Sequence, residues 1–550
     1  MRWPTSGRGR RAGDRALPRL ARVSATDAGD QPPQSAPATR RWLFADQLGP
    51  HFLDAADQPA LLLESTSVFT RRRFHRRKAH LVLSALRHRA AELGDQARYV
   101  RAATYREALA QGGVTSAAST EAPVSVVDPT SYGARRLVRR LQAQGHVQVL
   151  GSRGYAIAEA QFEHWAAGRG AEPGQRRLLM EDFYRDVRRH HRLLLDADGG
   201  PEGGRWNFDE DNREPAPKRA GTLQVAAGVP EPWWPTEDDV DAQVREDLDR
   251  LVRDEGVEFV GDDGPRRFAV TRAEALAVLE DFLAHRLEAF GTYEDAMLRG
   301  DRWMAHSLLS VPLNLGVVHP VEVARRAEQA YREDGVRLAS VEGFVRQVVG
   351  WREYVWQLYW HLGEEFRDRN ALGHTEPLPA WFADLDARGE VGAACLSDVL
   401  GQLREEGWVH HIPRLMVLGG YALQRGWSPQ ELRDWFHTSF VDGYDWVMTA
   451  NVIGMSQHAD GGVVATKPYW SGGAYIDRMS DYCGGCRYDP KKRLGEDACP
   501  FTAGYWAFTA RHEELLASNR RTARAVTGLH RLPDADAVVA QERERGPAAP

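Results

Sequence analysis

Three of the four cysteines in the chain lie within one short stretch. Cys483, Cys486 and Cys499 fall in "DYCGGCRYDPKKRLGEDACPF", and Cys395 lies far upstream. A Cys-x2-Cys pair can hold a metal on one turn, and the third thiol follows only twelve residues later. The stretch therefore indicates metal or redox chemistry.

Three interpretations of these thiols compete. Structural zinc favours four cysteines arranged as two local pairs, and the second pair is absent here. A redox Cys-x2-Cys would need neither Cys499 nor Cys395. An iron–sulfur cluster takes four thiolates, and a Cys-Pro end such as Cys499-Pro500 is common in its loops. The spacing puts the cluster first and zinc second, and leaves unrelated thiols as the third interpretation.

A second candidate is the adjacent pair His410 and His411 in "GWVHHIPRLM". Neighbouring side chains on a helix point about 100° apart, so such a pair is usually structural. A histidine with a pKa near neutrality can nevertheless donate a proton in a reaction. The pair is a candidate for acid catalysis.

Composition sets the context for these residues. The chain has 550 residues, 43% hydrophobic and 27% charged, with a net charge of −6, which is typical of a globular protein that does not bind polyanions along its whole surface. Four cysteines in a chain of this length are too few for a disulfide scaffold, so we expect the protein to be located in the reducing cytoplasm. No apolar run approaches the ~20 residues that cross a membrane. We expect a monomer.

The residues that position these groups divide into five segments. Residues 1–40 are rich in Arg, Pro, Ala and Gly and predict a disordered arm. Residues 41–165 alternate strands with helices, which predicts an α/β domain with a doubly wound parallel sheet. Residues 166–265 form a connector with Gly/Pro-rich stretches, residues 266–526 predict a larger all-α domain, and residues 527–550 predict a disordered tail.

Ligands of such a sheet bind beyond the carboxyl ends of its strands. Asp46 and Gln47 in "ADQLG", and Glu64 after the second strand, occupy these positions. Polar groups there can hold a pterin-like ring, or they can cap helices. No GxGxxG motif is present, so the domain is not an obvious NAD site.

The chain resembles the photolyase/cryptochrome superfamily. The resemblance rests on "FVRQVVGWREYVWQLYW", "RWMAHSLLSVPLNLGVVHP", "YDWVMTANVIGMSQHADGG" and "TKPYWSGGAYIDRMSDYCGGCRYDPKKRLGEDACPF". The last stretch resembles one branch, the iron–sulfur bacterial cryptochromes and photolyases, which includes the prokaryotic (6-4) photolyases. The resemblance covers Arg41 to Val526.

This resemblance implies three cofactors. The α/β domain would hold an antenna pigment, 6,7-dimethyl-8-ribityllumazine, and the all-α domain would hold FAD. A structural 4Fe-4S cluster would be held by the residues that match the family's ligands, Cys395, Cys483, Cys486 and Cys499.

The resemblance also assigns flavin-binding residues. Asn451 matches the residue that faces the flavin N5, where a neutral amide can tune the cofactor by hydrogen bonding. Trp435 matches the inner tryptophan of the electron relay, whose neighbouring tyrosine is Phe436 here, while Trp381 is close to a further relay position in uncertain register. Other candidates for FAD contacts are Ser307, Leu308, Asn314, Arg352, Asp442 and Asp445.

On the DNA side, the resemblance makes His410 and His411 the active-site histidines, flanked by Tyr469 and Tyr475. Arg213, Lys491 and Lys492 are candidate DNA contacts, and Asp209 is a candidate ligand for Mg2+. A (6-4) lesion needs a proton as well as an electron for repair, which the histidine pair can supply. We therefore expect a light-driven (6-4) DNA photolyase acting on UV-damaged DNA, with a blue-light photoreceptor of the cryptochrome type as the alternative.

Overall fold

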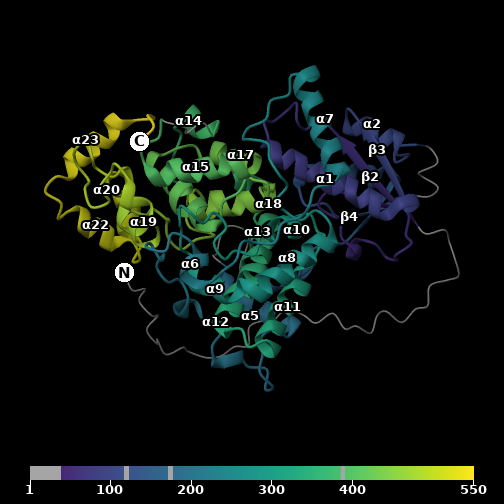
Figure 1. Cartoon of the computed structure of the whole chain (residues 1–550), viewed down its shortest axis with the longest axis horizontal. Helices are drawn as coiled ribbons and strands as arrows, with labels where there is room; N and C mark the ends of the chain where they lie inside the picture. Colours follow the sequence, from purple (N-terminus) through teal and green to yellow (C-terminus); the bar gives the residue numbers. More distant parts are fainter. Residues whose placement is uncertain (1–38, 117–122, 171–177, 386–389) are drawn as a thin grey trace.

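The computed structural model describes residues 39–116, 123–170, 178–385 and 390–550. The predicted arm lies outside the described residues except for its last two positions. Figure 1 shows the α/β region at one end of the molecule and the C-terminal helices at the other.

The N-terminal region contains the predicted parallel sheet. Its five strands are β1 (Arg41–Leu43), β2 (Ala60–Ser65), β3 (Ala97–Ala102), β4 (Val124–Val127) and β5 (Val147–Leu150). They lie in the order β3-β2-β1-β4-β5, and every neighbouring pair is parallel. Trp42 pairs with Leu61 on one side and Val126 on the other, so β1 lies at the centre.

Both faces of this sheet are buried, which explains the nearly continuous apolar strands. Leu61 and Leu63 pack on α2 (Tyr105–Gln111) and α3 (Tyr132–Ala143), whereas Ala60 and Leu62 face α1 (Arg76–Leu93) and the core shared with the helical region. Successive residues of a strand point to opposite faces, so a single strand supplies both cores. The prediction of a parallel sheet between helices is confirmed.

The segment predicted as a connector contains three helices, and a fourth ends at its N-terminal edge. They are α4 (Glu159–Ala167), α5 (Met180–His191), α6 (Leu223–Ala227) and α7 (Asp239–Glu255). Val244, Leu248 and Leu251 of α7 pack against α1, and the charged residues between them are either exposed or held in ion pairs, as Asp247 is with Arg87. The high charge of this segment concealed its apolar stripe.

The rest of the chain is helical, as predicted. Its helices are α8 (Arg272–His285), α9 (Leu287–Tyr293), α10 (Ser310–Asn314), α11 (Pro320–Glu333), α12 (Leu338–Val345), α13 (Arg352–His361), α14 (Ala380–Ala383), α15 (Ala394–Glu406), α16 (Gly420–Arg425), α17 (Pro429–Ser439), α18 (Asp445–Met448), α19 (Gly473–Met479), α20 (Pro500–Arg511), α21 (Glu513–Ser518) and α22 (Ala523–Leu529).

The prediction of a disordered tail at 527–550 is wrong. This segment forms helix α23 (Ala535–Arg545), which packs beside α20. Glu542 is buried between Arg425 and Arg545, and Asp534 pairs with Arg493 at 3.0 Å. The charges that suggested solvation are thus used in ion pairs with the helical region.

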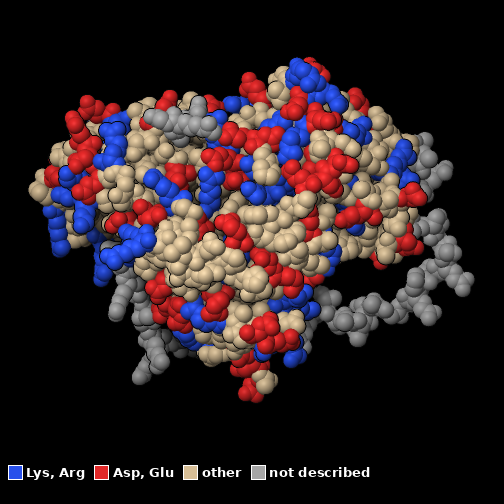
Figure 2. Space-filling model, viewed as in Figure 1, with Lys and Arg blue, Asp and Glu red and all other residues tan. Residues whose placement is uncertain are grey.

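Within the described residues, no helix is both long and apolar enough to span a bilayer. Figure 2 shows positive and negative side chains interleaved over the visible face, with several Lys and Arg side chains gathered around α22. This pattern agrees with the small net charge of the whole chain.

Candidate active site and cysteine cavity

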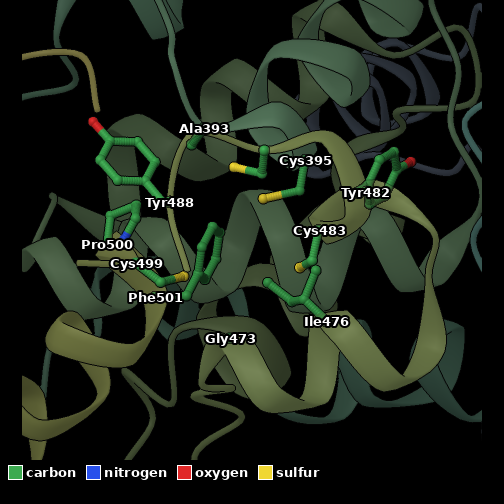
Figure 3. Close-up of a pocket in the computed structure, with 11 residues that line it drawn as sticks. Ala393, Cys395, Gly473, Ile476, Tyr482, Cys483, Tyr488, Cys499, Pro500 and Phe501 are labelled. Carbon is green, nitrogen blue, oxygen red and sulfur yellow. The ribbon is translucent and has the colours of Figure 1, made fainter. Parts of the chain in front are cut away.

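The four cysteines, from three separate segments, line one cavity. Cys395 lies in the first turn of α15, Cys483 and Cys486 lie in and directly after the short 3-10 helix η11 (Tyr482–Gly485), and Cys499 caps α20. Figure 3 shows their sulfur atoms directed into the same space. The remaining lining is mainly apolar: Ala393, Gly473, Ile476, Tyr482, Tyr488, Pro500 and Phe501.

The chemistry of this cavity favours a bound metal centre. All four thiols are free. Burial raises the pKa of Cys395 and Cys499, and raises that of Cys483 to about 12, so without a metal these groups are neutral thiols at pH 7. The backbone N–H of Ala394 donates to the Cys486 Sγ at 3.5 Å, a contact of the kind that tunes metal-bound thiolates.

The spacing of the sulfur atoms distinguishes between the metal centres. Tetrahedral zinc holds thiolates about 2.3 Å from the ion and therefore about 3.8 Å from one another. Among the described residues, which include all four cysteines, no three sulfur atoms lie within 4.8 Å of one another. The sulfur atoms are thus spaced more widely than the thiolates around one tetrahedral zinc ion.

The second site is built around three histidines. His306 precedes α10, and His410 and His411 follow α15 and precede the π-helical segment η9 (Pro413–Gly419). The His306 and His410 rings stack with centroids 4.4 Å apart, and His411 lies edge-on to His306 at 5.5 Å. The sequence identified the pair but missed His306, although "MAHSLL" lies within a stretch already assigned to the flavin.

The three rings lie in different environments. Burial lowers the pKa of His306 and His410 well below 6.5, and neighbouring positive groups lower it further. The His306 Nε2 and His410 Nδ1 atoms are buried and have no hydrogen-bond partner among the described residues. The side chain of His411 is instead 49% exposed, and its Nε2 lies 3.4 Å from the Asp295 Oδ1. His411 is therefore the ring that reaches both solvent and a carboxylate.

Two carboxylates that the sequence did not single out complete this site. Burial raises the pKa of Glu294 to about 7. Burial would also raise the pKa of Asp295, but its hydrogen bond with His411 and the charge of Arg213 outweigh burial and hold that pKa below its ordinary value. Nothing but an ordinary "YEDA" sequence marks them, because their role comes from tertiary contacts.

Arg213 joins the acids on the other side of His411. Its guanidinium lies 2.7 Å from Asp209, 3.2 Å from Glu294 and 3.4 Å from Asp295. Arg213 has a φ of 68°, an unfavourable backbone conformation for a residue with a side chain. The side chain that we predicted to contact DNA is thus anchored by three carboxylates, with 36% of it exposed.

The two predicted tyrosines belong to the same cluster. Burial raises the pKa of both Tyr469 and Tyr475, and the charges of Arg213 and Asp295 act on both hydroxyls. Both side chains are half-buried. His410 and His411 thus lie together, and Tyr469 and Tyr475 lie within range of the charges of Arg213 and Asp295. These four residues, with Arg213 and Asp209, are called the histidine site below.

Three π-helical segments lie at or beside the candidate flavin residues. They are η7 (Arg346–Trp351), which ends directly before Arg352, η9, which contains Arg414, and η10 (Thr449–Ser456), which contains Asn451. π-helical turns are rare and occur often at functional sites because they displace side chains from regular helical positions.

Asp442 lies at the centre of the polar contacts here. Arg414 donates to both of its carboxylate oxygens, at 2.9 and 3.0 Å, and the Asn314 Nδ2 donates to its backbone carbonyl at 3.2 Å. Arg352, a candidate for an FAD contact, pairs with Glu353 at 3.0 Å, whereas the cation that pairs with Asp442 is Arg414.

Arg352 and Asp445 lie in neighbouring networks. The Arg352 guanidinium lies over the Tyr155 and Trp446 rings, 4.7 and 5.2 Å from their centroids. Asp445 accepts from the Tyr359 hydroxyl at 2.7 Å and pairs with Arg367 at 3.3 Å. Asp445 therefore has internal partners, which weakens its candidacy as a cofactor contact.

The segment that leads into α10 is strained. Met304 and Leu308, on either side of His306, have φ values of 47° and 57°. Residues with side chains rarely adopt this conformation, and such strain is concentrated at functional sites. Nearby buried polar atoms without a partner among the described residues include Ser310 Oγ and Thr449 Oγ1. These unpaired groups, together with Ser307 and Asn451, fit a polar cofactor such as FAD.

Trp435 is buried, and its indole N–H donates to the Ala383 carbonyl at 3.1 Å. Its ring lies 4.5 Å from Phe382 and 5.1 Å from Phe436. Trp381 follows at 5.7 Å from Phe382 and is half-buried. A chain of aromatic rings thus links Trp435 to a partly exposed tryptophan, with Phe382 between them.

The three predicted antenna residues do not lie in one site. Asp46 and Gln47 line a cavity between the carboxyl edge of the sheet and the α10 region, together with Asp128, Thr130, Tyr155 and Arg352. Glu64 is not in that lining. Its carboxylate accepts from Arg87 at 2.8 Å and from Arg101 at 3.2 Å, and it also bonds Tyr99. Glu64 is therefore held in an ion-pair network of the sheet.

Lys491 and Lys492 are exposed on the loop between Cys486 and Cys499. Lys492 pairs with Asp497 of the same loop. The two lysines thus flank the cysteine cavity and lie apart from the histidine site in the sequence and among the contacts described.

The comparisons with known proteins agree with this architecture. Residues 41–262 match the family model of "Deoxyribodipyrimidine photo-lyase-related protein". A (6-4) photolyase of Agrobacterium fabrum is 38% identical over 496 residues, which cover 88% of this chain and 93% of that protein.

Two solved structures are also similar. A bacterial class III photolyase from Agrobacterium tumefaciens has a TM-score of 0.49 at 15% identity, over 93% of this chain and 97% of that chain. A cryptochrome from Synechocystis sp. PCC6803 has a TM-score of 0.50 at 12% identity, over 81% and 86%. Identity over nearly the full length of the Agrobacterium fabrum protein is the decisive comparison, and the chain therefore belongs to the photolyase-related protein family that includes this (6-4) photolyase.

Proposed function

We propose that the protein is a light-driven (6-4) DNA photolyase that acts on UV-damaged DNA. The observation that carries this proposal is the histidine site, where His410 and His411 lie with Tyr469 and Tyr475 beside a set of carboxylates. A group that must be protonated as well as reduced requires such an acid, whereas a lesion that needs only an electron does not.

The division of labour follows from burial. His411 is the proton donor, because it is half-exposed and its Nε2 lies 3.4 Å from the Asp295 carboxylate. His410 is desolvated and therefore neutral, so it orients the lesion by hydrogen bonding. Glu294, with a pKa near 7, can return a proton to His411 through Asp295 or water.

FAD would be held by Asn314, Asp442, Asn451 and the strained segment at Ser307 and Leu308, with Arg414 fixing the Asp442 carboxylate. When bound and reduced, this cofactor supplies the light-driven electron. Trp435 and its aromatic neighbours are the candidate route for reducing it.

The remaining assignments concern the other cofactors. Four widely spaced thiols around one cavity support a 4Fe-4S cluster with a structural role. Asp46 and Gln47 would hold 6,7-dimethyl-8-ribityllumazine at the edge of the sheet. Asp209 is our candidate ligand for Mg2+, but a cation there must displace the Arg213 guanidinium.

A repair assay tests the activity. The reduced protein is mixed with an oligonucleotide carrying one (6-4) lesion, and product is compared under blue light and in darkness by chromatography. We expect light-dependent restoration of the two thymines, and a loss of about 10²- to 10⁴-fold in His411→Ala. Exposed His530, which pairs with Glu513, supplies the control His530→Ala.

A photoreceptor with the same cofactors is the second candidate, because fold and cofactor sites serve both roles. The match to a cryptochrome structure concerns only the fold. Protein that contains FAD and cluster but repairs nothing in light would favour this second function.

A further inference from the structure

We propose that His306, His410 and His411 form a binding site for a divalent d-block cation such as Zn2+. One ring nitrogen from each of the three lies within 4.8 Å of the other two. This inference concerns a metal site and goes beyond the proposed repair activity; only its consequence for repair rests on that activity.

The first argument is that two buried ring nitrogens have no hydrogen-bond partner among the described residues. His306 and His410 are 8% and 4% exposed, yet His306 Nε2 and His410 Nδ1 have no hydrogen-bond partner among the described residues. Leaving two buried polar nitrogens unpaired costs about 1–3 kcal/mol each. A cation that accepts an electron pair from each of the two nitrogens would remove this cost.

The second argument is the identity of the donors. Neutral imidazole favours Zn2+, Ni2+ and Cu2+, whereas Mg2+ and Ca2+ favour oxygen ligands. Burial keeps His306 and His410 unprotonated, so a cation need not displace a proton from them. Three histidines with one open position are a common arrangement for zinc.

The third argument is the outer partner of His411. Its Nε2 lies 3.4 Å from the Asp295 carboxylate, which leaves Nδ1 for a metal. A carboxylate behind a ligating histidine fixes the ring and strengthens it as a ligand, and removing such a partner weakens metal binding about 10- to 100-fold. Asp295 is therefore a positioning residue for this site.

A cation at this site would bind the same nitrogens that repair requires. With His411 ligated, its Nδ1 lone pair is no longer available for a proton, and His410 cannot orient a lesion. Zn2+ should therefore inhibit repair reversibly, and a chelator should restore it.

The test measures binding directly, with activity as a separate readout. The FAD- and cluster-loaded protein is titrated with Zn2+ by isothermal calorimetry, with iron content checked before and after to exclude exchange at the cysteines. X-ray absorption of the zinc-loaded protein then counts imidazole ligands. We expect one site with three imidazoles, unaffected by excess Mg2+.

The variants locate the site. His411→Gln, at an exposed position, should weaken Zn2+ binding at least tenfold, and Asp295→Asn should weaken it about 10- to 100-fold. His306→Gln should abolish the site, with FAD content as the check on folding. The control is His512→Gln, which removes a different histidine pair, in which the Nε2 atoms of His374 and His512 lie 2.8 Å apart.

Each outcome is informative. Loss of the site in His411→Gln but not in His512→Gln supports the proposal even if the protein repairs no lesion. Unchanged binding in His411→Gln, zinc lost only in His512→Gln, or fewer than three imidazoles around the zinc would overturn it. Retained repair with the three-imidazole site fully occupied would overturn the inhibitory consequence alone.

Discussion

The cysteine cavity and the histidine site are both assembled from distant segments, but their surroundings differ. Mainly apolar side chains line the cysteine cavity, and the charges of Asp477 and Lys218 reach only its Cys483 side among the described residues. In the histidine site, Asp209, Glu294 and Asp295 each lie within ion-pair distance of Arg213. The first environment suits a group that is bound permanently, and the second suits proton movement.

This difference separates stability from chemistry. The thiols connect α15, η11 and α20, so filling their cavity ties the C-terminal helices together. The histidine site contains unpaired buried groups and positive φ values, which reduce stability and are maintained by the rest of the fold. Substitutions in the cysteine cavity should therefore impair folding, whereas substitutions in the histidine site should impair activity.

The largest expected effect is at the cysteine cavity. Cys486→Ser should lose the metal centre and, because ligand binding on the order of 10 kcal/mol also stabilises the fold, reduce soluble protein about tenfold or more. Iron, sulfide and soluble yield are the measurements. Gly484→Ala is the matched control, since nothing lies within 4 Å of the added Cβ. Soluble, FAD-loaded Cys486→Ser protein without iron would contradict the structural role.

The next effect concerns the flavin region behind the histidine site. Asp442→Asn leaves the partly buried Arg414 guanidinium without its charged partner, a loss that costs up to about 3–5 kcal/mol where such a pair is fully buried. We expect the purified variant to retain little FAD, as measured by flavin absorbance per protein. Asp434→Asn changes an exposed acid that pairs with Arg433 and should retain FAD as wild type does. Full occupancy in Asp442→Asn would remove Asp442 from the cofactor site.

Some of the residues behind these two predictions could be identified from the sequence, and others could not. The sheet and the helical region could be predicted, because they depend on apolar periodicity. The family resemblance, and not spacing alone, grouped Cys395 with the other three cysteines that line the same cavity. His306, Glu294 and Arg414 were missed as site residues. No local sequence signal marks them, and only tertiary contacts bring them to the site.

Two further predictions show how tertiary contacts decide the role of a charged residue. The position of Glu64 after the second strand predicts a ligand contact, which stays a prediction, whereas the predicted disorder of residues 527–550 is wrong. The structure uses Glu64 in ion pairs with Arg87 and Arg101, and it uses tail charges against Arg425 and Arg493. A charged side chain looks the same in the sequence whether it faces solvent, a ligand or an ion-pair partner.

A smaller effect should appear in the pH dependence of stability. Glu294 has a folded pKa near 7 against 4.5 when unfolded, so the folded state binds the extra proton between these values. Stability therefore falls as pH rises from 4.5 to 7 and then stays reduced, by about 3 kcal/mol at most. Glu294→Gln should remove this fall, as measured by denaturant unfolding at pH 5 and pH 8. Glu258→Gln, at a 74% exposed side chain, should leave the fall in place, and an unchanged pH profile in Glu294→Gln would exclude Glu294 as its source.

The smallest effect tests whether the cysteine region also serves DNA. Lys491 is exposed on the loop that joins Cys486 to Cys499, and Lys492 there pairs with Asp497. If Lys491 contacts a phosphate, Lys491→Ala should weaken binding to every DNA sequence alike and lower the slope of log K against log salt by about 1. Because Asp497 already offsets the charge of Lys492, the same change at Lys492 should do less, which makes it the internal control. Equal slopes in both variants and wild type would confine DNA contact to the histidine site and leave the cysteine loop a purely structural role.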